Sequence, residues 1–184
     1  MSRAGYVLAG GRSIRMGRDK ALLPFRGGRL AESVAEAVEA AAGSVAVVGR
    51  TELGRFRAIP DRYPGEGPLG GILTALADSA ADWNLVVACD MPEITAAFLT
   101  GLLDAAAASG ADALIPLGPS GRPEPLCAVY HRRCVGPLHG AFDRGVRKVM
   151  EAVAEVAAHV CPVVEVAQFQ NVNTPEDWSD YAAE

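Results

Sequence analysis

The sequence predicts an α/β fold of three layers (α/β/α), in which helices cover both faces of a mostly parallel central sheet. Short apolar runs alternate with stretches of helical periodicity along the 184-residue chain. Strands that alternate with helices form right-handed crossovers, which place successive strands parallel in one sheet. Hydrophobic residues make up 50% of the chain and charged residues 21%, which excludes a largely disordered protein. At this length we expect a single domain that covers residues 1–184.

The amino-terminal part of the chain predicts a strand followed by a helix. Residues 4–9 form an apolar run that ends at Gly10-Gly11, as expected for a buried strand that enters a turn. Residues 30–42 place apolar side chains at helical spacing, with glutamates on the other face and Gly43 as a stop. We therefore expect a strand over the first range and a helix over the second.

The middle of the chain predicts three strands and one helix. Residues 44–49 are a short apolar run and residues 55–60 alternate between polar and apolar side chains, so both are expected to be strands. The turn-rich segment 61–71 leads into an expected helix over 69–80. Residues 83–90 form a continuous apolar run, which is typical of a central strand that is buried on both faces.

The carboxyl-terminal part predicts three further strands. Thr95 is expected to cap a helix over 96–108, because its side chain can accept a hydrogen bond from the first turn. Residues 111–116 and 125–131 are apolar runs separated by a polar turn. Residues 162–166 are a last short apolar run, and each of these three segments is expected to be a strand.

Helices are expected between and after these strands. Residues 132–158 are predicted to be mainly helical, with one break at Gly136-Pro137 and another near Gly145. Residues 175–183 begin with a proline, which is favoured at the first position of a helix. We therefore expect a short terminal helix there.

Charge is unevenly distributed along the sequence. Residues 1–30 contain seven basic side chains and one acidic side chain, a net charge of +6, whereas the rest of the chain contains ten basic and twenty-one acidic side chains, a net charge of −11. A positive segment on an acidic protein predicts a local site for an anion. The sequence pI of about 5.2 argues against a nucleic-acid partner, which would need a broad basic surface.

The cysteines, histidines and apolar runs predict a protein of the cytoplasm. The four cysteines form no C-x-x-C pair, so we expect reduced thiols, and the three histidines lack the spacing of metal ligands. The amino terminus lacks the apolar region of a signal peptide. No run reaches the roughly 18 uninterrupted apolar residues of a membrane span, so we expect no membrane partner.

The segment after the first expected strand has the features of an anion site. Ligands of such sheets bind at the carboxyl ends of the strands, which here lie just after residues 9, 60 and 89. Gly10 and Gly11 let the backbone approach an anion and point N–H groups at it. Arg15 and Lys20 can neutralise phosphate oxygens. The alternative is a plain glycine turn with solvated arginines, and the spacing matches neither a P-loop nor G-x-G-x-x-G.

Two aspartates end the other strands that reach this edge. Asp61 follows the strand expected over 55–60, where a carboxylate can accept hydrogen bonds from the edge of a base and the glycine-rich turn leaves room for a flat ring. Its alternative role is that of a turn residue. Asp90 ends a buried strand, and one such carboxylate beside phosphates and waters suits Mg²⁺. Its alternative role is to cap the next turn.

Three segments of the chain form one set of motifs. They are L-A-G-G-x-x-x-R-M-G-x-D-K at 8–20, D-x-x-x-G-x-G-P-L-x-G at 61–71 and C-D-x-P at 89–92. This set resembles the MobA-like nucleotidyltransferases, and among them the molybdenum cofactor guanylyltransferases. The resemblance implies a Rossmann-like nucleotidyltransferase fold, with Arg15, Lys20 and Asp90 as catalytic residues and Mg²⁺ held by Asp90. The nucleotide-binding residues that it implies are Leu8, Ala9, Gly10, Gly11, Lys20, Asp61, Gly67, Pro68, Leu69, Gly70 and Asp90.

Two looser segments resemble stretches that border the pterin side of the cleft in this family. They are G-x-x-x-P-L at 121–126 and N-x-N-T-P-E-D at 171–177. The resemblance implies that Arg122, Asn171 and Asn173 bind the second substrate. The alternative for the second segment is a helix start with acidic residues in its first turn.

Two further positions stand apart from these motifs. The family guanylyltransferases carry an asparagine after the second strand, where this chain has Gly49. A side-chain contact to the nucleotide is therefore absent at that position. Arg147-Lys148 is either another anion contact or part of a solvated helix face.

The resemblance implies transfer of GMP from GTP to the phosphate of the molybdenum-pterin cofactor, with release of pyrophosphate. It also implies proteins that deliver the cofactor and molybdoenzyme chaperones as partners. A cytidylyltransferase of the same cofactor, or another small nucleotidyltransferase, is the alternative within the superfamily. A non-catalytic regulatory module that binds a nucleotide is the alternative from another class, although such a module would not need Lys20 together with Asp90.

Overall fold

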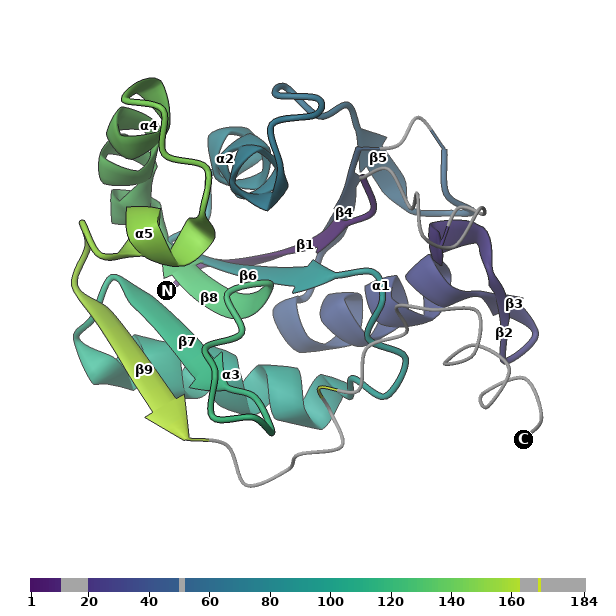
Figure 1. The fold of residues 1–184 in the computed structure, drawn as a ribbon. Helices are drawn as coiled ribbons and strands as arrows, with labels where there is room; N and C mark the ends of the chain where they lie inside the picture. Colours follow the sequence, from purple (N-terminus) through teal and green to yellow (C-terminus); the bar gives the residue numbers. More distant parts are fainter. Residues whose placement is uncertain (11–19, 50–51, 163–168, 170–184) are drawn as a thin grey trace.

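The central sheet has seven strands in the order β5-β4-β1-β6-β8-β7-β9 (Figure 1). A computed structural model describes residues 1–10, 20–49, 52–162 and 169. The sheet strands are β1 (Arg3–Leu8), β4 (Val45–Val48), β5 (Arg57–Ile59), β6 (Trp83–Ala88), β7 (Ala113–Leu117), β8 (Cys127–His131) and β9 (Ala158–Pro162). A separate two-stranded ribbon is formed by β2 (Pro24–Phe25) and β3 (Gly28–Arg29).

Five α-helices and two short 3₁₀ turns connect the strands within the described residues. They are η1 (Lys20–Leu22), α1 (Leu30–Ala42), α2 (Pro68–Asp78), α3 (Ala96–Ser109), η2 (Arg132–Cys134), α4 (Val135–Asp143) and α5 (Val149–Val153). The helix expected over 30–42 is confirmed at both ends, and Thr95 caps α3 by accepting a hydrogen bond from the Phe98 N–H at 3.3 Å. No helix among these residues is long and apolar enough to cross a membrane.

The sheet is mostly parallel, as predicted, and β8 is the exception. Strands β5, β4, β1 and β6 pair in parallel, and β7 pairs in parallel with β9. Strand β8 lies antiparallel between β6 and β7, with Val129 opposite both Leu85 and Leu114. A short loop joins β7 to β8, and a connection of that kind forms a hairpin instead of a crossover.

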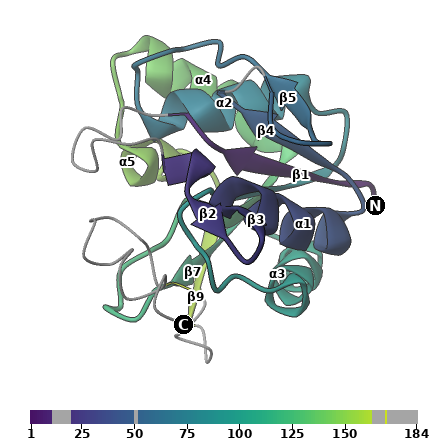
Figure 2. The same cartoon turned by 90° about the vertical axis from the view of Figure 1, so that its right-hand side faces the viewer.

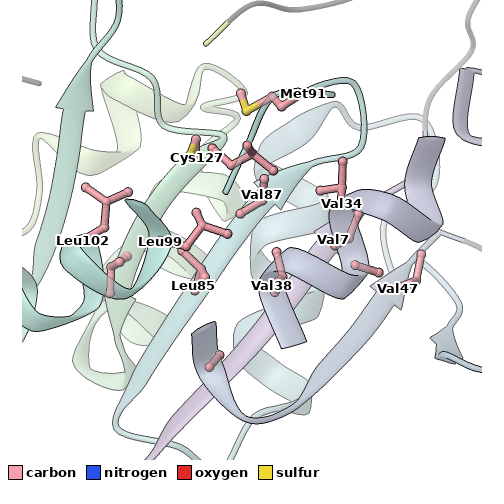
Figure 3. Packing of buried hydrophobic residues seen from close by; sticks show 14 of the residues in the cluster. Val7, Val34, Val38, Val47, Leu85, Val87, Met91, Leu99, Leu102 and Cys127 are labelled. Atoms are coloured by element: carbon pink, nitrogen blue, oxygen red, sulfur yellow. The ribbon is translucent and has the colours of Figure 1, made fainter. Parts of the chain in front are cut away.

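Helices cover both faces of the sheet, which confirms the three layers (Figure 2). Helices α1 and α3 pack on one face, while α2, α4 and α5 pack on the other. Figure 3 shows the first of these layers, where Val34 and Val38 of α1 and Leu99 of α3 meet the side chains of the sheet. Alternate residues of β6 enter opposite layers, because successive side chains of a strand point to opposite faces. The apolar run of β6 is thus buried on both sides.

Of the two breaks expected within residues 132–158, one differs from the prediction and one is confirmed. The expected break at Gly136-Pro137 is wrong, because α4 begins at Val135 and the proline lies in its first turn, where no N–H is required. The break near Gly145 is confirmed by a turn with φ +92° at that residue.

The last described strand also lies earlier than predicted. Strand β9 covers Ala158–Pro162, so the expected start at residue 162 is wrong. It pairs with β7 from Ala113 to Leu117, and this pairing fixes its position. Residues 163–166 and the helix expected over 175–183 lie outside the described residues.

Candidate functional site

A cavity of about 360 Å³ opens at the carboxyl ends of β1, β4 and β6. This is the edge at which the sequence places the ligand, and the volume is within the usual range of small-molecule sites. The cavity is lined by Leu8, Ala9, Gly10, Lys20, Ala21, Val48, Asp61, Gly67, Pro68, Gly71, Ala88, Cys89, Asp90 and Leu126. Segments that are far apart in the sequence therefore meet at one site.

Eight of the predicted nucleotide-binding residues line this cavity. They are Leu8, Ala9, Gly10, Lys20, Asp61, Gly67, Pro68 and Asp90. Leu69 and Gly70 do not line it, because Leu69, in the first turn of α2, is fully buried in the core and Gly70 faces the Tyr63 side chain. Gly71, Cys89 and Leu126 also line it; the sequence placed them in motifs without naming them as binding residues. Sequence reasoning missed Ala21, Val48 and Ala88, which carry no polar side-chain group to signal a role.

Some predicted residues lie elsewhere. Arg122 is exposed in the loop between β7 and β8, at the same edge of the sheet, and does not line the cavity. Gly11, Arg15, Asn171 and Asn173 lie outside the described residues.

Lys20 and Asp90 form an ion pair at the mouth of the cavity. The Lys20 Nζ lies 3.3 Å from Asp90 Oδ2, and the two side chains are 16% and 22% exposed. Lys20 begins η1, whereas Asp90 follows β6, so the folded sheet joins residues 70 positions apart. A partly desolvated pair of opposite charges at a strand end can contact a polyanion with the lysine and a cation with the carboxylate.

Asp61 is held by one of its two carboxylate oxygens. Oδ1 accepts a hydrogen bond from the Tyr63 N–H at 2.9 Å and lies 3.1 Å from the buried Thr74 hydroxyl. That hydroxyl accepts from the Arg62 N–H at 3.1 Å. Oδ2 lies on the side of Gly10, 4.0 Å from where a Cβ on that residue would be. Because Gly10 lines the cavity, the second oxygen lies on the cavity side of Asp61. Sequence reasoning did not single out Thr74, which binds the other oxygen.

The backbone of Gly10 packs directly against Gly49. A Cβ on Gly49 would lie 2.6 Å from the Gly10 Cα and 2.8 Å from its nitrogen, and the φ angle of Gly49 is +88°. The Gly49 N–H donates to the Ile59 carbonyl at 2.9 Å, which fixes this turn to β5. At position 49 this chain therefore uses a close backbone contact that only glycine permits.

The carboxyl group of Glu124 is affected by the negative charge of Asp90. Burial, and next the charge of Asp90, raise the pKa of Glu124, which stands at the end of the β7–β8 loop. Among residues 1–10, 20–49, 52–162 and 169, no group of three or more His, Cys, Asp or Glu side chains is arranged to hold a metal ion. Asp90 as a single carboxylate fits the way proteins commonly hold Mg²⁺, with one or two carboxylates and further ligands from bound phosphates and water.

Two of the cysteines, Cys127 and Cys134, are buried thiols that are not activated as nucleophiles. The four thiols form no disulfide. Burial raises the pKa of Cys127 and raises the pKa of Cys134 to about 12. Both thiols are therefore protonated at neutral pH and are structural.

Comparison with known proteins gives a consistent result. A model of the MobA-like NTP transferase domain matches residues 5–159. A probable molybdenum cofactor guanylyltransferase of Methanothermobacter thermautotrophicus is 34% identical, covering 93% of this chain and 94% of that protein. One from Deinococcus radiodurans is also 34% identical, over 95% and 91%.

Solved structures share the fold. A molybdopterin-guanine dinucleotide biosynthesis protein A of Archaeoglobus fulgidus superposes with a TM-score of 0.83 at 29% identity, covering 97% of this chain and 96% of that one. A 2-C-methyl-D-erythritol 4-phosphate cytidylyltransferase of Thermus thermophilus has a TM-score of 0.74 at 20% identity, over 100% and 98%. The second likeness concerns the fold alone.

Proposed function

Because the chain belongs to the MobA-like NTP transferase family, we propose that it transfers GMP from GTP to the phosphate of the molybdenum-pterin cofactor. The products are pyrophosphate and the guanine dinucleotide form of the cofactor. The chain is a nucleotidyltransferase whose curated relatives at 34% identity are named for this activity. We assign this activity to the cavity because it is lined by both the Lys20–Asp90 ion pair and the loop that contains Asp61.

The triphosphate is proposed to lie over the amino end of η1. Lys20 would contact its oxygens, and the backbone after β1 at Gly10-Gly11 would donate N–H groups to them. Arg15 is proposed to stabilise charge on the leaving oxygens. Asp90 would hold a divalent cation, which we propose is Mg²⁺, and that cation supplies positive charge against the triphosphate.

The reaction needs positioning more than proton transfer. An oxygen of the acceptor phosphate forms a bond to the α-phosphorus of GTP, and the bond from that phosphorus to the β-phosphate oxygen breaks. The acceptor is a phosphate monoester that is mostly dianionic at neutral pH, so no general base is required. Lys20 and Asp90 therefore act by charge and geometry.

The two substrates are proposed to occupy opposite parts of the site. Asp61 and the Gly67-Pro68 turn would bind the nucleoside, since all three residues line the cavity and Asp61 Oδ2 lies on the side of Gly10. Arg122, Asn171 and Asn173 are proposed for the pterin substrate. Proteins that deliver the cofactor or receive it are proposed as partners, and nucleic acid is not.

Incubation with the molybdenum-pterin acceptor and GTP, CTP, ATP or UTP in turn tests this function. We expect the guanine dinucleotide and pyrophosphate with GTP in the presence of Mg²⁺, and little product with the others. Formation of the cytosine dinucleotide instead would establish the cytidylyltransferase alternative. Nucleotide binding with no pyrophosphate release in the presence of acceptor would establish a binding module.

Replacement of Lys20 by alanine should weaken GTP binding and slow the reaction. Loss of one preorganised cation at the phosphates is expected to reduce kcat/KM on the order of 10²-fold. Calorimetric titration with GTP and initial rates of pyrophosphate release measure the two effects. Arg3→Ala is the control, because it removes a basic side chain of the same segment at the other end of β1, where Arg3 pairs with Asp104 at 2.6 Å. An unchanged GTP titration for Lys20→Ala would contradict the assigned role.

A further inference from the structure

The loop that contains Asp61 is hydrogen-bonded to α4 through Tyr63, which does not line the cavity. The Tyr63 hydroxyl lies 3.0 Å from His139 Nε2, and His139 Nδ1 lies 3.1 Å from Asp143 Oδ2. This chain of contacts is satisfied when Nδ1–H donates to Asp143 and Nε2 accepts the Tyr63 proton. A side chain of the loop is thus hydrogen-bonded to a helix that begins more than 70 residues later.

A second contact holds the same loop at Glu66. Arg147 Nε donates to Glu66 Oε2 at 2.5 Å. The guanidinium is itself oriented, because NH1 donates to the carbonyls of Phe142 at 2.8 Å and Val146 at 3.0 Å. Its carbon also lies 4.0 Å from the centroid of the Phe142 ring. Although the Arg147 and Glu66 side chains are 41% and 47% exposed, the Arg147 guanidinium is held in the orientation of the pair by these other contacts.

The Tyr63 ring is packed as well as hydrogen-bonded. Its centroid lies 4.8 Å from that of Phe142 on α4. Helix α2 approaches the start of the same side chain so closely that a Cβ on Gly70 would lie 2.9 Å from the Tyr63 Cβ. Gly70, which does not line the cavity, thus provides the space that Tyr63 occupies. The Tyr63 residue therefore contacts both α2 and α4, which pack against each other (Figure 1).

These contacts reach the cavity through Asp61. The Tyr63 N–H donates to Asp61 Oδ1 at 2.9 Å, and the Glu66 N–H donates to the Tyr63 carbonyl at 3.1 Å. None of Tyr63, Glu66, His139 and Arg147 lines the cavity. Asp61 Oδ1 is held both by the Tyr63 N–H of the loop and by the Thr74 hydroxyl of α2. Loss of the loop contact would leave only the second of these bonds to orient the carboxylate, and Lys20 and Asp90 lie outside this chain of contacts.

We propose that His139 and Arg147 are positioning residues for recognition of the nucleotide base, acting through Tyr63 and Glu66 on Asp61. The inference rests on the proposed function, in which Asp61 binds the nucleoside. Guanine presents two adjacent N–H donors on one edge. Asp61 Oδ2, whose position is fixed because Oδ1 is hydrogen-bonded within the protein, can accept from that edge and so favours guanine over bases that lack the donors. The sequence left open whether Arg147 contacts an anionic ligand. In the structure it pairs with Glu66 of the protein.

The test compares wild type with His139→Ala, Arg147→Ala and the double variant. For the double variant we expect KM for GTP to rise about tenfold and the preference for GTP over CTP to fall by a similar factor, as for a loss of orientation. The value of kcat should stay within about twofold, because the groups at the α-phosphorus are untouched. Combining Glu66→Arg with Arg147→Glu should recover part of the loss that Arg147→Glu causes alone.

Arg133→Ala is the matched control, because Arg133 Nε also pairs with a carboxylate, Asp112, at 2.6 Å, but at the opposite edge of the sheet. Amide hydrogen exchange of the ligand-free protein gives a readout that is independent of the reaction. The Tyr63 and Glu66 amides, both hydrogen-bonded within the loop, should exchange faster in the double variant and not in the control.

The outcomes separate the inference from the proposed function. A wild type that forms no guanine dinucleotide overturns the function, and the exchange experiment still decides whether α4 holds the loop. A wild type that forms it, with a folded double variant that keeps its GTP preference, overturns the inference. A fall in kcat with unchanged KM also overturns it.

Discussion

Replacement of Asp90 by alanine should abolish nucleotidyl transfer and leave the fold intact. Asp90 is the carboxylate that β6 delivers to the cavity, and no cluster of three metal-binding side chains exists among the described residues to take over its role. We expect pyrophosphate release to fall by at least about 10³-fold, because the triphosphate loses the cation that offsets its charge. The rate is measured with GTP and the pterin acceptor over a range of Mg²⁺ concentrations.

Two comparisons test whether the loss of activity in Asp90→Ala comes from the missing carboxylate and not from unfolding. Asp104→Ala removes an exposed aspartate whose contact is the Arg3 ion pair, and its activity should equal that of wild type. The melting temperature of Asp90→Ala should lie within a few degrees of the wild-type value, since the side chain is partly exposed. Binding of Mn²⁺ in the presence of GTP, followed by electron paramagnetic resonance, should also be weakened. A variant that retained near-normal Mg²⁺-dependent activity would exclude Asp90 as the metal ligand.

Replacement of Gly49 by alanine should damage both stability and GTP binding. The new methyl group would lie 2.6 Å from the Gly10 Cα, and the φ angle of +88° is unfavourable for any residue that has a Cβ. We expect a loss of about 1–3 kcal/mol in the free energy of unfolding. Since the neighbouring atoms are backbone, relief of the contact must move the turn after β1, and the affinity for GTP should fall at least about tenfold.

Gly43→Ala separates the two causes of this effect. Gly43 ends α1 at φ +79° and has nothing within 4 Å of the position of a Cβ. That variant should share the cost of the backbone conformation and keep the GTP affinity of wild type. Chemical denaturation and calorimetric titration measure the two quantities. Equal GTP affinities for the two variants would show that the contact between Gly49 and Gly10 does not shape the site.

The sequence by itself determined the features that depend on neighbours in the chain. The helix over 30–42 was predicted with its observed bounds, because its apolar periodicity and its terminal Gly43 act over a few residues. The long apolar run before Asp90 and the glycines after β1 located the strand ends that form the cavity. The rule that ligands bind at the carboxyl ends of parallel strands then indicated the edge of the sheet.

Only the tertiary structure decided the features that depend on pairing between distant segments. The antiparallel direction of β8 and the start of β9 at Ala158 follow from hydrogen bonding to neighbouring strands. The contacts of the Asp61 loop with His139 and Arg147 arise because α4 packs beside α2. The local sequence pattern shows which face of a helix or strand is apolar. It does not show which other element covers that face, because several packing partners would bury it equally well. The packing of the whole core selects one of these arrangements. That arrangement also determines which side chains contact and position the site.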